Sequence, residues 1–390
     1  MWNNELLEIL GYPPNTTDIE TTPYDIFQPF EQNYADNATT NVLHEEGPFN
    51  IQIDLEEKNK PINLPCFSDD RCVFPGQVLA LITTNPDHIN FFRDAFEKYH
   101  QVAFFPYSKK FKSGRLRGVL LKMFNFGNSG PNYYVKFFAI RMIRSVNSVT
   151  LLDIPEGEIH VIHPLGNHDV LVEIEDLELI TRQIEGNYSL QQWPIGATRF
   201  WKNNRWSDMC QKIKEHFNAI GLPEKYMEKA MAQNPAFLSY YFIECIVTTY
   251  DEKVDLLNSP SIESRVYTGL QMQKNYKGLI CKDCGVALRF TEPMIISVAG
   301  ISPDFTNRGG FHHRGLCLKS TYTQDQYETG DSWFPNYAWS IYNCSQCTNH
   351  LGWSFCNYAN MSPLIFTCIT MKNVAIKRYI PFEDKNILCT

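Results

Sequence analysis

The sequence predicts an α+β protein in which a β-rich pseudo-barrel carries a helical insert and is followed by an all-β, zinc-bound domain. Three observations predict this order: β-type runs between turn formers from Asn63 onward, a block of helical spacing after Trp193, and two C-x-x-C pairs in an aromatic-rich last third. A chain of 390 residues is too long for one compact core, so we expect two or three domains.

Charge and hydropathy exclude two classes of partner. The formal net charge of -8 leaves no broad basic face for a phosphate backbone, so no direct nucleic-acid ligand is expected. No apolar run of about 18 residues appears, which predicts neither a membrane span nor secretion. The 12 cysteines are then expected to be thiols and metal ligands, because disulfides are rare in reducing compartments.

The first 60 residues form an acidic arm. Residues 1–50 contain nine carboxylates and no Lys or Arg, with Asn, Thr and Pro between them. This composition predicts disorder over residues 1–60. An acidic interaction tail and a solvated leader both fit, and the solvated leader is favoured.

Residues 61–277 are expected to form the pseudo-barrel and its insert. β-Type runs occur at Val73, Val78–Ile82, Val102–Phe105, Gly118–Leu121 and Tyr133–Ile143. Turn formers over residues 126–132 separate the last two, and residues 86–100 have helical spacing. One helix within a meander of strands favours a barrel over a Rossmann sheet.

Residues typical of helix starts and ends are frequent over residues 193–270. Ser207 is predicted to cap a helix that ends at Gly221, and Asn234-Pro235 and Ser259-Pro260 are each predicted to open another. This region reads as a helical insert of the barrel domain.

Two C-x-x-C pairs, called knuckles below, predict one structural metal site in residues 278–385. Cys281 and Cys284 form the first C-x-x-C pair, and Cys344 and Cys347 form the second. Four thiolates complete the tetrahedral shell of one zinc ion and leave no open coordination position. The metal is therefore expected to fold the domain and not to catalyse.

Three tryptophans bracket the second knuckle. Trp333, Trp339 and Trp353 fall within 21 residues, and Trp353 and Phe355 are two apart in a strand-like run, so they share a face. A buried aromatic core is one interpretation. The prolines and glycines between the indoles favour the other, a rigid cage for a small ligand.

The strings S-W-F-P-x-Y-A-W and C-x-x-C-x-x-H-x-G-W-x-F resemble the cereblon family, substrate receptors of cullin-based ubiquitin ligases with a thalidomide-binding CULT domain of β-tent architecture. Residues 74–81 similarly resemble the start of a Lon-protease N-terminal domain, and Trp193-Pro194 with the helical insert resembles the family's adaptor-binding bundle. The likeness covers about residues 60–385 and is most specific after Cys281.

The resemblance implies site residues and partners. The three tryptophans would be the walls of a pocket for a cyclic imide, Phe355 its floor, the backbone of Asp331 and Trp333 its hydrogen-bonding edge, and Asn307 a loop residue above it. Asp331 stands where the family carries His, and an ionised carboxylate cannot donate to an imide carbonyl. Implied partners are a propeller-type adaptor of the DNA damage-binding protein family, a cullin held through it, and protein substrates, in cytoplasm and nucleus.

Other functions remain open at this stage. The same cage would take a quaternary ammonium by cation–π attraction. The zinc scaffold also resembles B-type methionine-sulfoxide reductases, with Cys368 as the candidate nucleophile, although its flanking residues are neutral and β-branched. A Lon-type protease is excluded because the chain contains no Gly-Lys dipeptide for a P-loop. His160, His163 and His168 form a loose group in which no second metal is expected.

Overall fold

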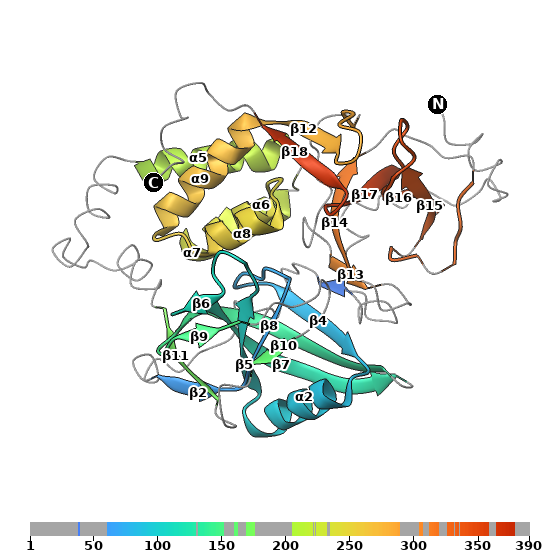
Figure 1. Ribbon diagram of the computed structural model, residues 1–390. Helices are drawn as coiled ribbons and strands as arrows, with labels where there is room; N and C mark the ends of the chain where they lie inside the picture. Colours follow the sequence, from blue (N-terminus) through green and yellow to red (C-terminus); the bar gives the residue numbers. More distant parts are fainter. Residues whose placement is uncertain are drawn as a thin grey trace.

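A computed structural model of the chain has a barrel-like sheet, a group of helices beside it and a second β-rich part linked to the helices (Figure 1). It describes residues 38–39, 61–129, 132–151, 160–162, 169–175, 205–220, 222, 224–231, 235–288, 304–306, 312–319, 326–330, 332–334, 336–358 and 364–378. Within these ranges no helix is both long and apolar enough to cross a membrane.

The barrel-like sheet has the order β10-β3-β5-β7-β8-β11-β2, with β4 also paired to β8. Its strands are β2 (Ile62–Leu64), β3 (Cys66–Asp69), β4 (Val78–Thr83), β5 (Gln101–Pro106), β7 (Arg117–Ser129), β8 (Asn132–Ser145), β10 (His160–Ile162) and β11 (Val170–Ile174). Two further short strands, β6 (Ser113–Gly114) and β9 (Val149–Thr150), pair with each other. Both faces of the sheet bury apolar residues, because Phe104 belongs to one buried cluster and its neighbours Ala103 and Phe105 to another.

The helix between β4 and β5 is confirmed. Helix α2 (Pro86–Lys98) begins where Asn85 accepts a hydrogen bond from the backbone of Asp87, with proline at the first helical position. Its Phe92 packs edge-on against Phe67 at 5.3 Å between ring centroids. This contact closes one face of the sheet.

Two details of the predicted strands are wrong. Val73 is buried but lies in no strand, since the chain there approaches the Gly76 turn, and the preceding strand is β3. The predicted turn over residues 126–132 is shorter than expected, because β7 runs to Ser129 and β8 begins at Asn132. The turn formers there are accommodated in a long hairpin with two register shifts.

Five helices follow the sheet in the described part of the chain. They are α5 (Arg205–Ala219), α6 (Glu224–Met231), α7 (Pro235–Glu244), α8 (Tyr250–Leu257) and α9 (Ile262–Asn275). The opening of α7 at Pro235 was predicted. Two predicted caps are wrong: Ser207 lies inside α5, and α9 is capped by Ser261 and not by Ser259, because the Ser261 side chain accepts the backbone N–H of Ser264.

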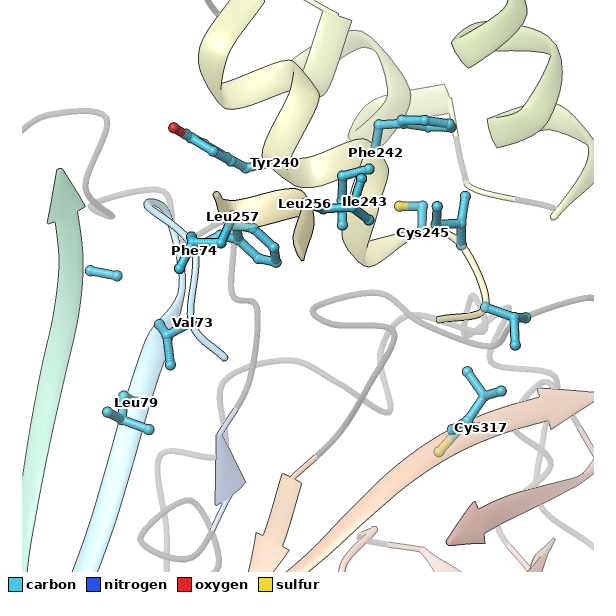
Figure 2. Close-up of a cluster of buried hydrophobic side chains, with 14 of the residues drawn as sticks. Val73, Phe74, Leu79, Tyr240, Phe242, Ile243, Cys245, Leu256, Leu257 and Cys317 are labelled. Atoms are coloured by element: carbon cyan, nitrogen blue, oxygen red, sulfur yellow. The ribbon is translucent and has the colours of Figure 1, made fainter. Parts of the chain in front are cut away.

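Buried aromatic and charged side chains join these helices to the barrel. Phe74 stacks on Tyr240 of α7 at 5.6 Å between ring centroids, and Figure 2 labels both residues. The Arg265 guanidinium lies 4.3 Å from the centroid of the same tyrosine. Arg265 is 1% exposed and donates to Leu256 O and Ser239 Oγ, so its charge is well solvated by protein groups. The Phe74–Tyr240 contact joins the helical group to the barrel part, and the Arg265 contacts join α7, α8 and α9 to one another.

The last third forms a six-stranded sheet of order β1-β13-β14-β17-β16-β15 and a two-stranded ribbon. The sheet contains β1 (Ala38–Thr39), β13 (Asp304–Thr306), β14 (His312–Lys319), β15 (Tyr337–Asn343), β16 (His350–Asn357) and β17 (Ile365–Thr370). The ribbon pairs β12 (Tyr276–Cys281) with β18 (Val374–Arg378) and leaves α9 directly (Figure 1). Arg378 of the ribbon forms an ion pair with Glu252 of α8, which ties this part to the helices.

The acidic arm contributes one short strand. Ala38 and Thr39 pair with Phe305 and Asp304, which extends the sheet of the last third. The prediction of disorder therefore fails at these two residues, because backbone hydrogen bonding to a sheet edge does not depend on side-chain hydrophobicity. The rest of residues 1–60 lies outside the described residues.

The predicted fold class is confirmed. A barrel-like sheet with one helix, a helical group and a separate β-rich part with four clustered cysteines follow one another in the expected order. The residue boundaries assigned to the three parts stay predictions.

Candidate functional site

The four predicted cysteines meet at one point. Cys281 ends β12, Cys284 follows in a turn, and Cys344 and Cys347 lie in the loop between β15 and β16. Their sulfur atoms all lie within 4.8 Å of one another, and Cys281 Sγ–Cys347 Sγ and Cys284 Sγ–Cys344 Sγ are each 3.6 Å. Zn–S bonds of about 2.3 Å in a tetrahedron require sulfurs roughly 3.8 Å apart. The donor set and spacing therefore fit one zinc ion.

Backbone groups prepare the second knuckle for a metal. The backbone N–H of Cys347 bonds the Cys344 sulfur and is the main reason that the pKa of this thiol falls to about 7. Thr348 takes a left-handed conformation with φ of 58°, and its N–H donates to Cys344 O. A site of four sulfurs at this spacing is confirmed as suited to one structural ion.

Next to the metal site, one face of the sheet carries the aromatic residues. In the register of β15 and β16, Trp339 lies opposite Phe355, and Ile341 lies opposite Trp353. Directly opposed residues of antiparallel strands share a face. Trp339 and Trp353 therefore project from the same side, as the spacing of Trp353 and Phe355 predicted for β16.

The third tryptophan reaches this face from a loop. Trp333 lies before β15, and its ring centroid is 4.6 Å from that of Trp353, with planes at 69°. It is also 6.4 Å from Phe355. Near-perpendicular indoles at this distance form a corner, which is the geometry of two adjoining walls.

The face changes from a packed core to a more open surface along the strands. At the packed end, Phe355 is 1% exposed and contacts Phe334 at 4.7 Å and Phe366 at 5.0 Å between centroids. On the same face the three tryptophans are half-buried, and Ile341, opposite Trp353, is 51% exposed. Phe355 therefore packs as core, whereas the three tryptophans keep accessible surface; the cage for a small ligand stays a prediction.

The indole N–H of Trp339 is already used in a hydrogen bond within the protein. Its indole Nε1–H donates to Gly330 O at 2.6 Å, and its backbone forms a two-bond bridge with Glu328. With the N–H occupied, Trp339 offers a ligand its ring face and not a hydrogen bond. The polar recognition of a ligand must then come from other groups.

Two predicted site residues cannot be placed. Asn307 and Asp331 lie outside the described residues, so their predicted positions above the pocket and at its edge stay predictions. The sequence analysis did not assign a pocket role to His350, which contacts Trp353 at 4.7 Å. Residues three apart in a regular strand face opposite sides, so the sequence carried no periodic signal for this contact.

Cys368, the candidate nucleophile, is buried on β17 in register with Trp353. It is 1% exposed on β17, opposite Trp353 on one side and Cys317 on the other. Of the histidine group, His160 pairs in β10 with Ser68, while His163 and His168 lie outside the described residues.

Comparison with known proteins gives one consistent name. The chain is 28% identical over 203 residues to the protein named cereblon of Gallus gallus, covering 50% of this chain and 44% of that protein. It is 26% identical over 203 residues to cereblon of Xenopus tropicalis, with the same coverage, and 27% identical over 172 residues to cereblon of Danio rerio, covering 43% of this chain and 39% of that one. The resemblance to cereblon is confirmed, and the matches span less than half the length of these relatives.

No family model matches the chain. Among solved structures, the Lon N-terminal domain protein of Xanthomonas campestris aligns with a TM-score of 0.33 and 11% identity, over 53% of this chain and 96% of that one. The N-terminal domain of Mycobacterium avium complex Lon protease aligns with a TM-score of 0.33 and 13% identity, over 55% of this chain and 98% of that one.

Proposed function

We propose that this chain is a non-catalytic substrate-recognition subunit of a cullin-RING ubiquitin ligase, acting in cytoplasm and nucleus. Its pocket takes cyclic imides, either as small molecules or as the cyclised C-terminal ends of proteins. The helical group binds a propeller-type adaptor, which holds the cullin. The sequence similarity to cereblon supports the class of protein, and the pocket chemistry is the basis for the ligand.

The observation that carries the proposal is that two half-buried indoles meet nearly at right angles next to a packed pair of phenylalanines. Trp333 and Trp353 stand 4.6 Å apart at 69°, and Trp339 is on the same face as Trp353. Beneath them Phe355 and Phe366 stack at 5.0 Å with planes at 18°. A flat ring entering such a corner loses its hydration against apolar faces without requiring the protein to rearrange.

A cyclic imide suits these faces because its polarity lies along one edge. The ring has one N–H donor between two carbonyl acceptors, and its remaining atoms are apolar. Indole faces can cover the apolar part while backbone groups near Trp333 pair with the polar edge. Since Trp339 Nε1–H is already bonded to Gly330 O, it does not compete for the imide carbonyls.

The metal supports this site without taking part in chemistry. Four sulfurs fill the coordination shell of a bound zinc, so the ion would polarise no substrate. Cys344 and Cys347 precede β16 by a few residues, and β16 carries Trp353 and Phe355. When bound, the ion would hold this strand and β12 together.

Affinity purification from cells, followed by mass spectrometry, tests the assignment. The wild-type chain is expected to recover a propeller adaptor and a cullin, with additional proteins when a glutarimide compound is added. The Trp339→Ala variant should retain adaptor and cullin but lose the compound-dependent proteins. Recovery of neither adaptor nor cullin with the wild-type chain would refute the ligase assignment.

A further inference from the structure

The segment between the second metal knuckle and Trp353 contains a histidine that is fixed on several sides. The backbone carbonyl of His350 accepts a hydrogen bond from Asn373 Nδ2 at 2.6 Å. Its ring atom Nε2 lies 2.9 Å from Gly352 O. A carbonyl oxygen only accepts, so His350 Nε2 carries the proton and donates. This hydrogen bond holds the His350 imidazole against the backbone of the first residues of β16.

This held ring lies against Trp353. The centroids of His350 and Trp353 are 4.7 Å apart, with planes at 77°. Trp333 contacts Trp353 at 4.6 Å, so the Trp353 indole has one ring neighbour in its own strand and one in the loop before β15.

Gly352 allows the chain to bring the two rings together. Its φ of 148° lies in the region that favours glycine, and a Cβ there would lie 2.0 Å from Cys368 O. The strand therefore approaches β17 closely at this point. The register shift between Tyr342 and Asn343 in the β15–β16 pair is adjacent, since Asn343 pairs with His350.

Trp333 depends on this arrangement because it lies outside the regular strands. Its ring centroid lies 4.6 Å from that of Trp353 and 6.4 Å from that of Phe355. Phe355 is fixed in the core, whereas Trp353 is half-buried and has the His350 ring as one of its neighbours. Loss of the His350 ring would widen the range of rotamers open to the Trp353 indole, and would thereby change the angle at which Trp333 meets it.

We infer that His350 is a positioning residue for the aromatic pocket: it fixes the Trp353 indole, and through it Trp333, so that the two walls meet at the angle that a flat ligand requires. The ligand part of this inference rests on the proposed function. The geometric part does not, because it concerns the relative orientation of two indoles in the free protein.

Three variants separate positioning from simple stability. His350→Ala removes both the ring contact and the donor, and His350→Phe restores an aromatic ring without the donor. His100→Ala is the matched control, since His100 also lies edge-on to a ring, 5.3 Å from Phe96 at 82°, but at the end of α2 in the barrel. Each variant is measured in the full chain for zinc content, for the circular-dichroism exciton signal of the coupled indoles, and for calorimetric binding of glutarimide.

We expect His350→Ala to retain one zinc, to lose most of the exciton signal and to bind glutarimide at least about tenfold more weakly. His350→Phe should recover most of the exciton signal, while His100→Ala should match wild type in all three measurements. An unchanged exciton signal in zinc-loaded His350→Ala would overturn the inference. If that variant does not fold, His350→Phe decides: retention of the exciton signal supports positioning by the ring contact, and its loss overturns it.

A wild-type protein that binds no glutarimide refutes the proposed ligand and leaves the exciton measurement to decide the role of His350. If wild type binds and His350→Ala binds equally well, the positioning role is refuted while the proposed function stands. The two failures are therefore distinguishable.

Discussion

Replacing Trp339 and Phe355 separately by alanine should give opposite results, although the two residues face each other across β15 and β16. Phe355 is 1% exposed and packs on Phe334 and Phe366. Truncation of a fully buried aromatic residue costs about 3–5 kcal/mol. Since 1 kcal/mol lowers the melting temperature by about 4–8 °C in a domain of 60–100 residues, a size near that expected for residues 278–385, Phe355→Ala should lower it by at least about 12 °C.

Trp339 is half-buried, and its indole makes a hydrogen bond to Gly330 O. Its truncation should cost roughly half as much, about 2 kcal/mol, because much of its surface is already hydrated. Loss of one of the walls of a small pocket should weaken glutarimide binding by about 2 kcal/mol or more, which is about 30-fold. Thermal unfolding and calorimetric titration of both variants measure the two effects.

Trp206→Ala on α5 is the control, because Trp206 is a half-buried tryptophan packed on the core in the helical group. It should lose stability without changing ligand affinity. The reasoning is refuted if Trp339→Ala loses as much stability as Phe355→Ala and binds glutarimide as wild type does. That outcome would make the tryptophans core residues.

Further predictions concern the metal, acid stability, the arm and the pocket edge. Cys284→Ser or Cys347→Ser should reduce zinc below one equivalent and unfold the last third, as measured by metal analysis and hydrogen exchange; a metal-free protein with an unchanged melting curve would contradict the site. Burial lowers the pKa of His216 below its usual 6.5, so the unfolded state binds the proton more readily and stability should fall as pH drops below about 6.5; His216→Gln should flatten this slope in urea titrations at several pH values. Deleting residues 1–45 removes β1 and its pairing with β13, and should cost about 1–2 kcal/mol in thermal unfolding, whereas deleting residues 1–36 should cost nothing measurable. Asp331→His should strengthen glutarimide binding by about 1–2 kcal/mol in calorimetry, because it supplies a potential donor; weaker binding would place the side chain elsewhere.

The sequence predicted the metal site because its signal is local and chemically specific. Two C-x-x-C pairs allow few alternatives, and the loops that carry them need only bring four sulfurs within bonding distance of one ion. The resulting separations of 3.6 Å follow from that requirement. The alternation of Trp353 and Phe355 predicted their common face for a similar reason, since strand geometry fixes it.

Long-range pairing could not be predicted in the same way. β1 joins β13 across more than 260 residues, and nothing in the sequence of Ala38–Thr39 specifies an edge partner. The N-cap predicted for α9 was wrong because two serines in one short segment, Ser259 and Ser261, both suit that role, and the helix begins after Ser261. The contact of His350 with Trp353 depends on the bend at Gly352, which a periodicity argument does not include.

Calorimetric titration of the wild-type chain with glutarimide, and in parallel with a trimethylammonium compound, tests the central claim most directly. A pocket built from indole corners with a polar edge for an imide should bind glutarimide with a defined stoichiometry of about one, and should lose that binding in Trp339→Ala. Binding of the trimethylammonium compound with no response to glutarimide would contradict the account, because the same three tryptophans would then act as a cation cage.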